Sequence, residues 1–145
     1  MPAPMTKTER EEFLAGVHVG VLSVNRPARG PLTMPLWYRY EPGGEIILVT
    51  RPETRKARLI RAEMPVAFLV QSEELPPKYV SLEGRVVSVT PADVDRDLRP
   101  IARRYLSAAV ADGYLDATRP NGVTNEVVIR IRPERWFSRD FGKSG

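Results

Sequence analysis

The sequence predicts a mainly β protein with helices, namely a six-stranded antiparallel Greek-key split β-barrel with about three flanking α-helices. Short runs of apolar and β-branched residues recur along the chain between turns that contain proline or glycine, which indicates strands joined mostly by hairpins. Helical patterns occur only near the start, in the middle and before the last strand. This distribution favours a barrel with attached helices over a doubly wound sheet, in which strands and helices alternate.

The composition fits one globular domain. The chain has 145 residues, of which 42% are hydrophobic and 28% charged, as in ordinary folded domains. We therefore expect a single split-barrel domain over residues 1–145, in which residues 1–7 form a loose N-terminus. The net charge of +4 permits a polyanion or a small phosphorylated ligand as a partner.

Several classes of protein and site are excluded by residue content. The chain has no cysteine and a single histidine, His18, which excludes disulfides, thiolate nucleophiles and metal sites built from cysteine or several histidines. No run of about 18 apolar residues and no apolar leader is visible, so we expect no membrane span and no export signal. These expectations together point to a cytoplasmic protein without a metal centre.

A helix and a strand are expected at the start of the chain. The segment Thr8–Glu11 has the pattern of a capping box, so a short helix is expected to run to Ala15. The strand after it, over residues 17–24, is largely apolar on both faces, which suits a barrel wall. Gly20 within it indicates a bend or a close approach, and we interpret His18 as a structural or interface residue rather than a ligand.

The next two expected strands cover residues 31–40 and 46–49. Pro35 has no N–H group to donate to a ladder, so the first of these strands lies at a sheet edge or contains a bulge there. A bulge would leave neighbouring backbone groups free to bond a ligand. The second strand is a short β-branched run, which fits a strand buried on both faces.

The second half of the chain is expected to complete the barrel. The strand over residues 79–90 has the clearest alternation of apolar and polar residues, and Gly84 within it suggests a bend for barrel closure. The remaining elements are a helix over 55–63 capped by Thr54, a strand over 66–70, a helix over 91–111 broken near Pro100, a strand over 123–131 and a closing segment over 135–141.

A cluster of cations follows the third expected strand and indicates a phosphate site. Arg51, Arg55, Lys56 and Arg58 gather at the first turn of the helix over residues 55–63, where free backbone N–H groups and the positive end of the helix dipole would also favour an anion. The nearby threonines add hydroxyl donors. A solvated charged helix face is the alternative interpretation of the same residues.

Several segments, taken in order, resemble the pyridoxamine-phosphate-oxidase-like split-barrel family, whose members bind flavin or deazaflavin. The resemblance covers nearly the whole chain, from Phe13 to Lys143. Each segment alone is a weak match, and their joint order and spacing make the resemblance specific. The segments are Phe13–Leu14 through Val21–Leu22, Pro35–Tyr38, Val49–Arg51 with Thr54–Arg58, Pro65–Val70, Val80–Arg85 and Trp136–Lys143.

The resemblance implies a homodimer with cofactor sites at the subunit interface and a small-molecule substrate. In that picture Arg55 and Lys56 neutralise the cofactor phosphate, backbone groups of the second strand bond the ring edge, and Trp136 of the partner subunit covers the ring or instead anchors the tail. The implied cofactor-binding residues are Pro35, Leu36, Trp37, Val49, Thr50, Arg51, Arg55, Lys56 and Trp136.

The implied cofactor is FMN, with the deazaflavin coenzyme F-420 as the alternative and haem or biliverdin in some branches of the family. The implied function is hydride transfer between the bound cofactor and a small organic substrate, or else a non-catalytic carrier or sensor role. The short C-terminal end and the single histidine depart from pyridoxamine-phosphate oxidases, so we do not expect oxidation of vitamin B6. No residue pattern identifies a catalytic acid.

A nucleic-acid-binding barrel is the remaining hypothesis. Arginines and the aromatic residues of the second strand are the groups that contact backbone and bases in such proteins. Trp37 and Tyr38 lie on opposite faces of one strand, however, and so form a poor shared stacking platform. We therefore expect no nucleic-acid partner.

Overall fold

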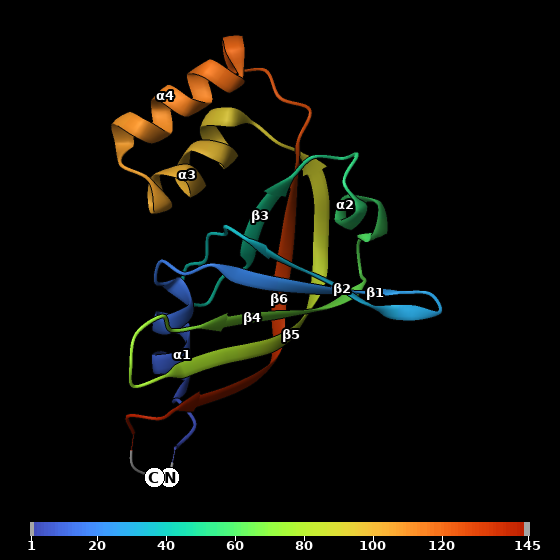
Figure 1. The fold of residues 1–145 in the computed structure, drawn as a ribbon. Coiled ribbons are helices and arrows are strands. Elements are labelled where there is room, and N and C mark those ends of the chain that lie inside the picture. Colours follow the sequence, from blue (N-terminus) through green and yellow to red (C-terminus); the bar gives the residue numbers. More distant parts are fainter. Residues whose placement is uncertain (1, 144–145) are drawn as a thin grey trace.

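The computed structural model describes residues 2–143 as one antiparallel sheet that curls into a half-barrel, with helices around it (Figure 1). The mainly β prediction with six strands is confirmed. The strands are β1 (Gly20–Arg26), β2 (Arg29–Leu36), β3 (Ile46–Thr50), β4 (Pro65–Gln71), β5 (Lys78–Pro91) and β6 (Val127–Asp140). The helices are α1 (Lys7–Ala15), α2 (Arg55–Leu59), α3 (Arg99–Tyr105) and α4 (Ala108–Thr118), with short helical turns η1 (Val94–Leu98) and η2 (Pro120–Gly122).

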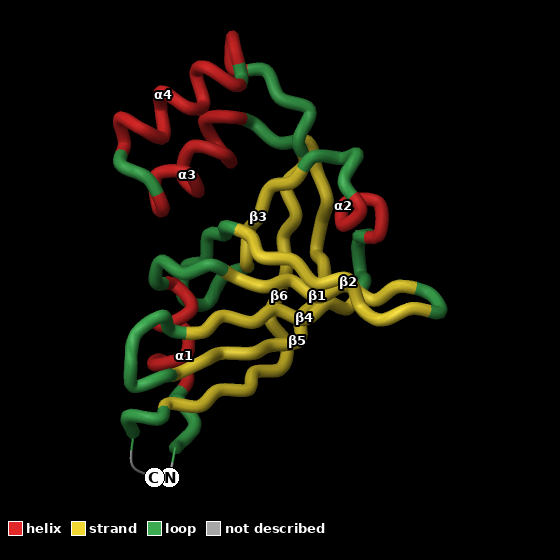
Figure 2. Tube along the Cα trace, in the orientation of Figure 1, coloured by secondary structure: helices red, strands yellow, loops and turns green. Residues whose placement is uncertain are grey.

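The strand order is β2-β1-β4-β5-β6-β3, and all paired neighbours are antiparallel. The segment that follows β2 is joined to β3 by an isolated bridge, in which the backbone N–H groups of Arg39 and Ile47 donate to each other's carbonyl oxygens at 2.9 and 2.8 Å. Pro35 lies in β2, the edge strand, as its missing N–H group requires. Figure 2 shows the resulting curl of the strands.

The core lies inside the curled sheet because alternate residues of each strand point inward. Phe68 and Tyr38 are among the largest buried side chains and meet edge to face at 5.1 Å. Gly20 lies opposite this cluster, where a Cβ atom would come within 2.2 Å of the Phe68 ring. The expected close approach at this glycine is therefore confirmed. The other strand residues of the core include Leu22, Val24, Ile46, Leu48, Val80, Leu82, Ile129 and Ile131.

The N-terminal segment differs from the expected loose end over residues 1–7. Met1 lies outside the described residues. Ala3 pairs with Asp140 at the end of β6, and the buried Met5 donates its backbone N–H to the Ser138 hydroxyl at 2.9 Å. The helix cap is Thr6 rather than the expected Thr8, because this attachment fixes the chain before α1 and lets Thr6 form the capping box with Glu9.

The last strand is longer than the sequence predicts. β6 does not end at residue 131 but continues to Asp140, so the closing segment 135–141 is largely strand, paired with the first half of β5. A register shift between Glu83 and Gly84 places Gly84 opposite Pro133. The irregularity leaves Glu134 of β6 without a partner and accommodates a proline inside the ladder.

In place of the single helix expected over residues 91–111, η1 runs directly into α3, and α4 follows as a separate helix. Pro100 occupies the first turn of α3 and does not break it. The break lies at residues 106–107, where the Ser107 hydroxyl caps α4, and α4 continues past the expected end to Thr118. α2 is also shorter than the expected helix over 55–63, because it ends at Leu59.

The helices α3 and α4 form a hairpin above the β3 end of the barrel (Figure 1). They have their own small apolar cluster, which includes Val94, Leu98, Ala102, Ala111 and Leu115. Arg104 of α3 fastens this hairpin to the barrel by donating to the backbone carbonyls of Tyr38, Ala15 and Gly16 at 2.8–3.1 Å. The hairpin thus forms one wall of a space whose other wall is the sheet.

Candidate functional site

A cleft of about 210 Å³ lies between the α3–α4 hairpin and the ends of β2 and β3. Its walls are mainly apolar, and its polar groups are one lysine, one tyrosine and an arginine–glutamate pair. A mostly apolar concavity with a few polar groups is the usual form of a small-molecule site. The lining residues are Leu36, Trp37, Val49, Lys56, Leu98, Ile101, Ala102, Tyr114, Leu115, Arg119 and Glu126.

Trp37 is the aromatic element of the cleft. It follows β2, where the chain leaves the sheet edge, and its side chain stays 42% exposed although Tyr38 beside it is fully buried. The indole is stacked on the ring of Tyr105, with centroids 4.5 Å apart and planes tilted by 7°. The stack restrains an exposed indole, and a restrained aromatic face is suited to bind a planar ring.

Tyr105 is fixed in turn by hydrogen bonds. Its hydroxyl donates to the carbonyl oxygen of His18 at 2.7 Å and accepts from the backbone N–H of Tyr38 at 3.1 Å. Burial raises the pKa of the Tyr105 hydroxyl, which therefore stays protonated and able to donate. The position of Trp37 thus depends on a residue that lies 68 positions further along the chain.

Lys56 supplies the cationic group. Thr54 caps α2 by accepting from the Ala57 N–H, and Lys56 in the first turn of this helix lines the cleft. Burial lowers the pKa of Lys56, and within residues 2–143 no carboxylate lies within ion-pair distance of its ammonium group. A half-buried ammonium without a counter-ion favours an anionic ligand.

The rim of the cleft carries an ion pair. Arg119, at the end of α4, donates from Nε and Nη2 to one carboxylate oxygen of Glu126 at 3.0 and 2.9 Å. Thr124 donates to the same oxygen at 2.6 Å. The two charged side chains are only 11% and 10% exposed, so this pair holds the end of α4 against the start of β6 and closes one side of the cleft.

The structure brings together part of the predicted cofactor site. Leu36, Trp37, Val49 and Lys56 line the cleft, whereas the other predicted residues do not. Pro35 pairs with Val21 in the sheet. Thr50 is buried, and its hydroxyl lies 3.2 Å from that of Thr54. Arg51 is exposed, and Arg55 lines a separate hollow beside α2.

Trp136 lies away from the cleft within this chain. Its ring packs against the barrel core, meets Tyr40 edge to face at 6.3 Å, and lies under the guanidinium of Arg10 at 4.8 Å. Of the two interpretations given for this residue, these contacts describe an anchor for the last strand.

Sequence reasoning missed the wall formed by α3 and α4. Ile101 and Ala102 are buried core residues that also line the cleft, and Tyr105 supports Trp37. Arg119 and Glu126 were not singled out at all. A signal for Tyr105 existed in the sequence, because a tyrosine in an apolar stripe needs a partner for its hydroxyl.

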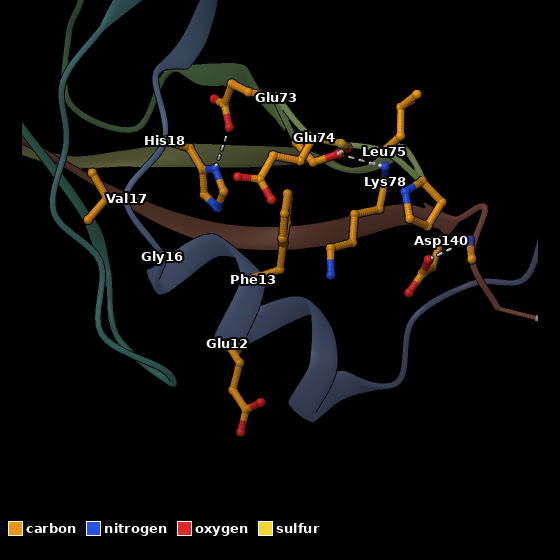
Figure 3. Close-up of a pocket in the computed structure, with 13 residues that line it drawn as sticks. Glu12, Phe13, Gly16, Val17, His18, Glu73, Glu74, Leu75, Lys78 and Asp140 are labelled. Carbon is orange, nitrogen blue, oxygen red and sulfur yellow. Dashed lines mark hydrogen bonds and ion pairs between the residues drawn. The ribbon is translucent and has the colours of Figure 1, made fainter.

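A larger cavity of about 670 Å³ lies on another side of the molecule, between α1 and the turn that joins β4 to β5 (Figure 3). Its polar groups are mostly carboxylates, from Glu12, Glu73, Glu74 and Asp140. His18 packs on Phe13 and its Nδ1 lies 3.3 Å from Glu73. Carboxylates in this number disfavour a phosphate.

Two further properties of the described chain bear on function. Residues 2–143 contain no group of three or more histidine, aspartate or glutamate side chains placed to hold a metal ion. Within the same residues, no helix combines the length and apolar character that crossing a membrane requires.

Comparison with known proteins places these observations in a family. The family model described as pyridoxamine 5'-phosphate oxidase matches residues 6–140. A conserved hypothetical protein of Mycobacterium tuberculosis is similar in structure, with 23% identity over 97% of this chain and 90% of its own and a TM-score of 0.74. No curated protein sequence matches the chain.

Two other similar structures have names that mention a cofactor. An F420 reductase has 22% identity over 87% of this chain and 94% of its own, with a TM-score of 0.61. A FAD-binding protein of Mesorhizobium loti has 20% identity over 97% of this chain and 98% of its own, with a TM-score of 0.65. At these identities the likeness concerns the fold.

Proposed function

Because the chain belongs to the pyridoxamine 5'-phosphate oxidase family, we propose that it is an oxidoreductase that binds FMN or the deazaflavin coenzyme F-420 at the cleft. The observation that carries this proposal is the unpaired, half-buried ammonium of Lys56, which lies in the same cleft as the stacked indole of Trp37. An anionic group and a planar ring are the two parts that a flavin-type phosphate cofactor brings together.

The residues present fit such a cofactor. Lys56 would hold the phosphate, with Arg55 and Arg51 adding positive potential from the same segment. Trp37 and the apolar side chains of Leu36 and Val49 would hold the ring and keep water from one face of it. When bound, the cofactor supplies the hydride-transfer chemistry, and the protein supplies binding, orientation and a dry surface.

We also propose a homodimer that completes the site. The cleft of about 210 Å³ is below the usual range of ligand pockets, roughly 300–1,000 Å³, so part of a cofactor would lie outside the cleft of one chain. On the outer face of the sheet, Val21, Leu69, Ser81 and Phe137 are direct cross-strand neighbours. Leu69 and Phe137 are 38% and 49% exposed, and a second copy of the chain would cover them.

A non-catalytic carrier or sensor is the second candidate function. It is favoured by the acid–base content of the cleft, where the one carboxylate among the lining residues, Glu126, is held by Arg119 and Thr124. A group tied up in this way is a poor proton donor or acceptor for a substrate. Steady turnover of the bound cofactor with a reductant and an acceptor would exclude this candidate.

The experiment that tests the proposal is a visible spectrum of the purified protein, followed by titration with FMN and with the deazaflavin coenzyme. We expect saturable binding of one of them. In Lys56→Ala the affinity should fall at least about tenfold, because this change corresponds to the free energy of one charge-assisted contact. Arg132→Ala, which removes an exposed cation of β6, is the matched control and should bind as the parent does. Absence of binding of both cofactors would contradict the proposal.

A further inference from the structure

The buried ion pair at the rim of the cleft uses only one of the two carboxylate oxygens of Glu126. Oε1 accepts three hydrogen bonds, two from Arg119 at 3.0 and 2.9 Å and one from Thr124 at 2.6 Å. Within residues 2–143 no hydrogen bond reaches the other oxygen, Oε2. Arginine–carboxylate pairs frequently use both oxygens, one for each donor of the guanidinium fork. Here both donors meet at Oε1, which leaves Oε2 free.

Oε2 lies at the accessible part of a side chain that is otherwise enclosed. The Glu126 side chain is 10% exposed. Among residues 2–143, the fully buried side-chain nitrogen and oxygen atoms without a hydrogen-bond partner are Arg10 Nε and Arg39 Nε. Oε2 also lacks a partner and is not one of these atoms, so it remains in contact with solvent. Because Glu126 lines the cleft, we take this free acceptor oxygen to belong to the cleft wall.

The carboxylate is held in place from several sides. Arg119 also donates from Nη1 to the Thr118 hydroxyl at 2.7 Å, which restrains the guanidinium that holds Oε1. The backbone N–H of Glu126 donates to the Thr124 hydroxyl at 3.2 Å, and its carbonyl oxygen accepts from the N–H of Ala92 at 2.9 Å. Oε2 is therefore an acceptor that is oriented before a ligand arrives, which lowers the entropic cost of binding.

The surroundings of Glu126 in the cleft favour a hydrogen-bond donor. The neighbouring walls are mainly apolar and comprise Val49, Leu98, Ile101, Ala102 and Leu115. In such surroundings a hydrogen bond to a charged oxygen is stronger than in water. A ligand group that can only accept, such as a carboxylate, would face Oε2 unpaired and would be disfavoured.

The cation of the cleft does not supply this donor. Lys56 and Glu126 both line the cleft, but no ion pair within residues 2–143 joins them. In the proposed function Lys56 and Trp37 hold the cofactor. The second molecule of the reaction is then the one that can meet Oε2.

From this arrangement we propose that Glu126 is a specificity-determining residue, whose Oε2 accepts a hydrogen bond from a hydroxyl or N–H group of the substrate. The inference rests on the proposed function and deepens it, because it names the substrate class. That class is a small, mainly apolar molecule that carries a hydrogen-bond donor and no carboxylate at the same position. Arg119 already balances the charge of Glu126, so a neutral donor is sufficient. The role is binding and involves no proton transfer.

The test compares three aromatic probes of similar size. They are para-nitrobenzyl alcohol, which has a donor, its methyl ether, which has none, and para-nitrobenzoate, which is an anion. Their binding is measured by equilibrium dialysis with detection of the nitroaromatic absorbance. The protein is used both without a cofactor and loaded with oxidised FMN or oxidised deazaflavin coenzyme, whichever binds.

Glu126→Gln is the informative variant. Its amide oxygen can keep the three hydrogen bonds of Oε1, so that the amide NH₂ group replaces Oε2 and turns an acceptor into a donor. Glu134→Gln is the matched control, because it makes the same substitution in an exposed ion-paired glutamate of β6. The comparison among probes in the parent protein does not depend on the folding of either variant.

We expect the loaded parent protein to bind the alcohol about tenfold more tightly than the ether and the benzoate. Glu126→Gln should abolish the advantage of the alcohol over the ether and should improve the binding of the benzoate relative to both. Glu134→Gln should keep the preferences of the parent protein.

The outcomes separate failure of this inference from failure of the proposed function. With a cofactor bound, equal affinities for alcohol and ether, binding of no probe, or an advantage that persists in Glu126→Gln would each overturn this inference alone. An advantage that is present without cofactor and lost with it would show that Oε2 serves the cofactor, and would also overturn it. Absence of binding of both cofactors would overturn the proposed function and the inference together.

Discussion

The indole of Trp37 and the phenol ring of Tyr105 lie nearly parallel, with centroids 4.5 Å apart and a tilt of 7°. Trp37 comes from the end of the edge strand β2, and Tyr105 is the last residue of α3. The contact therefore joins the barrel to the helical hairpin at the edge of the cleft. It explains how a side chain that is 42% exposed can keep one orientation.

Replacement of Tyr105 tests this relationship. Tyr105→Phe keeps the ring stack but removes the hydroxyl that donates to His18 and accepts from Tyr38, so we expect a loss of about 1–2 kcal/mol in the free energy of unfolding. Tyr105→Ala should cost more, because it also removes the stack. Urea unfolding followed by circular dichroism measures both.

Tyr79→Phe is the control for this pair. Both tyrosines are partly buried, but of their two hydroxyls only that of Tyr105 is hydrogen-bonded within residues 2–143, so the Tyr79 substitution should change the free energy of unfolding by less than about 0.5 kcal/mol. If Tyr105→Phe were as stable as the parent protein, the hydroxyl would not fix the position of α3.

Gly20 permits the closest approach in the core. A Cβ atom at this position would come within 2.2 Å of the Phe68 ring, so Gly20→Ala should destabilise the protein by about 1–3 kcal/mol through overpacking. Phe68→Leu should restore part of this loss in the double variant. Gly30→Ala is the matched control, since no atom lies within 4 Å of its added methyl group. Equal melting temperatures for the Gly20 and Gly30 variants would contradict the account.

Much of the fold could be predicted from local patterns, but the choice between equivalent patterns could not. Both Thr6 and Thr8 are followed three residues later by a glutamate, so the capping-box pattern fits either one. The structure selects Thr6 because Ala3 and Met5 are fixed against β6, and this contact joins residues more than 130 positions apart. A local pattern carries no information about such a contact.

The candidate site could be predicted only in part. The cationic segment and the end of β2 indicated Lys56 and Trp37, and both line the cleft. The separation of Arg55 from Lys56 was not foreseen, although consecutive residues on a helix point about 100° apart. The wall from α3 and α4 was missed because its place depends on tertiary contacts, such as those of Arg104 with the barrel backbone.

The ion pairs inside the helical hairpin predict an acid-sensitive element. Hydrogen bonds from Arg103 and Arg99 lower the pKa of Asp112 from 3.8 to about 2. A carboxyl whose pKa is lower in the folded state stabilises the protein above its unfolded pKa, and this contribution is lost as the pH falls toward the folded value. The contribution of Asp112 should therefore be complete near pH 5 and decline between about pH 4 and pH 2.

The measurement is the difference in melting temperature between the parent protein and Asp112→Asn at several pH values. We expect the parent to melt higher at pH 5 and the difference to shrink toward zero as the pH approaches 2. A difference that stays constant over this range would show that the two arginines do not act through the charge of Asp112.

The exposed apolar residues on the outer face of the sheet predict that the protein forms a dimer. Leu69→Lys/Phe137→Lys places charges at the two exposed apolar positions among the cross-strand neighbours Val21, Leu69, Ser81 and Phe137. Burying these charges against a second copy would be costly, so we expect the double variant to be monomeric. Val110→Lys/Val123→Lys alters two exposed apolar residues outside the sheet and should remain dimeric. Sedimentation equilibrium distinguishes these states, and a monomeric parent protein would contradict the proposed dimer.

The central claim is that the cofactor ring lies beside Trp37, and tryptophan fluorescence tests it most directly. The chain has two tryptophans, so Trp136→Phe leaves Trp37 as the only indole and Trp37→Phe leaves Trp136. During titration with FMN or the deazaflavin coenzyme, we expect saturable and strong quenching in Trp136→Phe and weaker quenching in Trp37→Phe, both shifted to higher ligand concentration by Lys56→Ala. Saturable binding that leaves the emission of Trp37 unchanged would contradict the account.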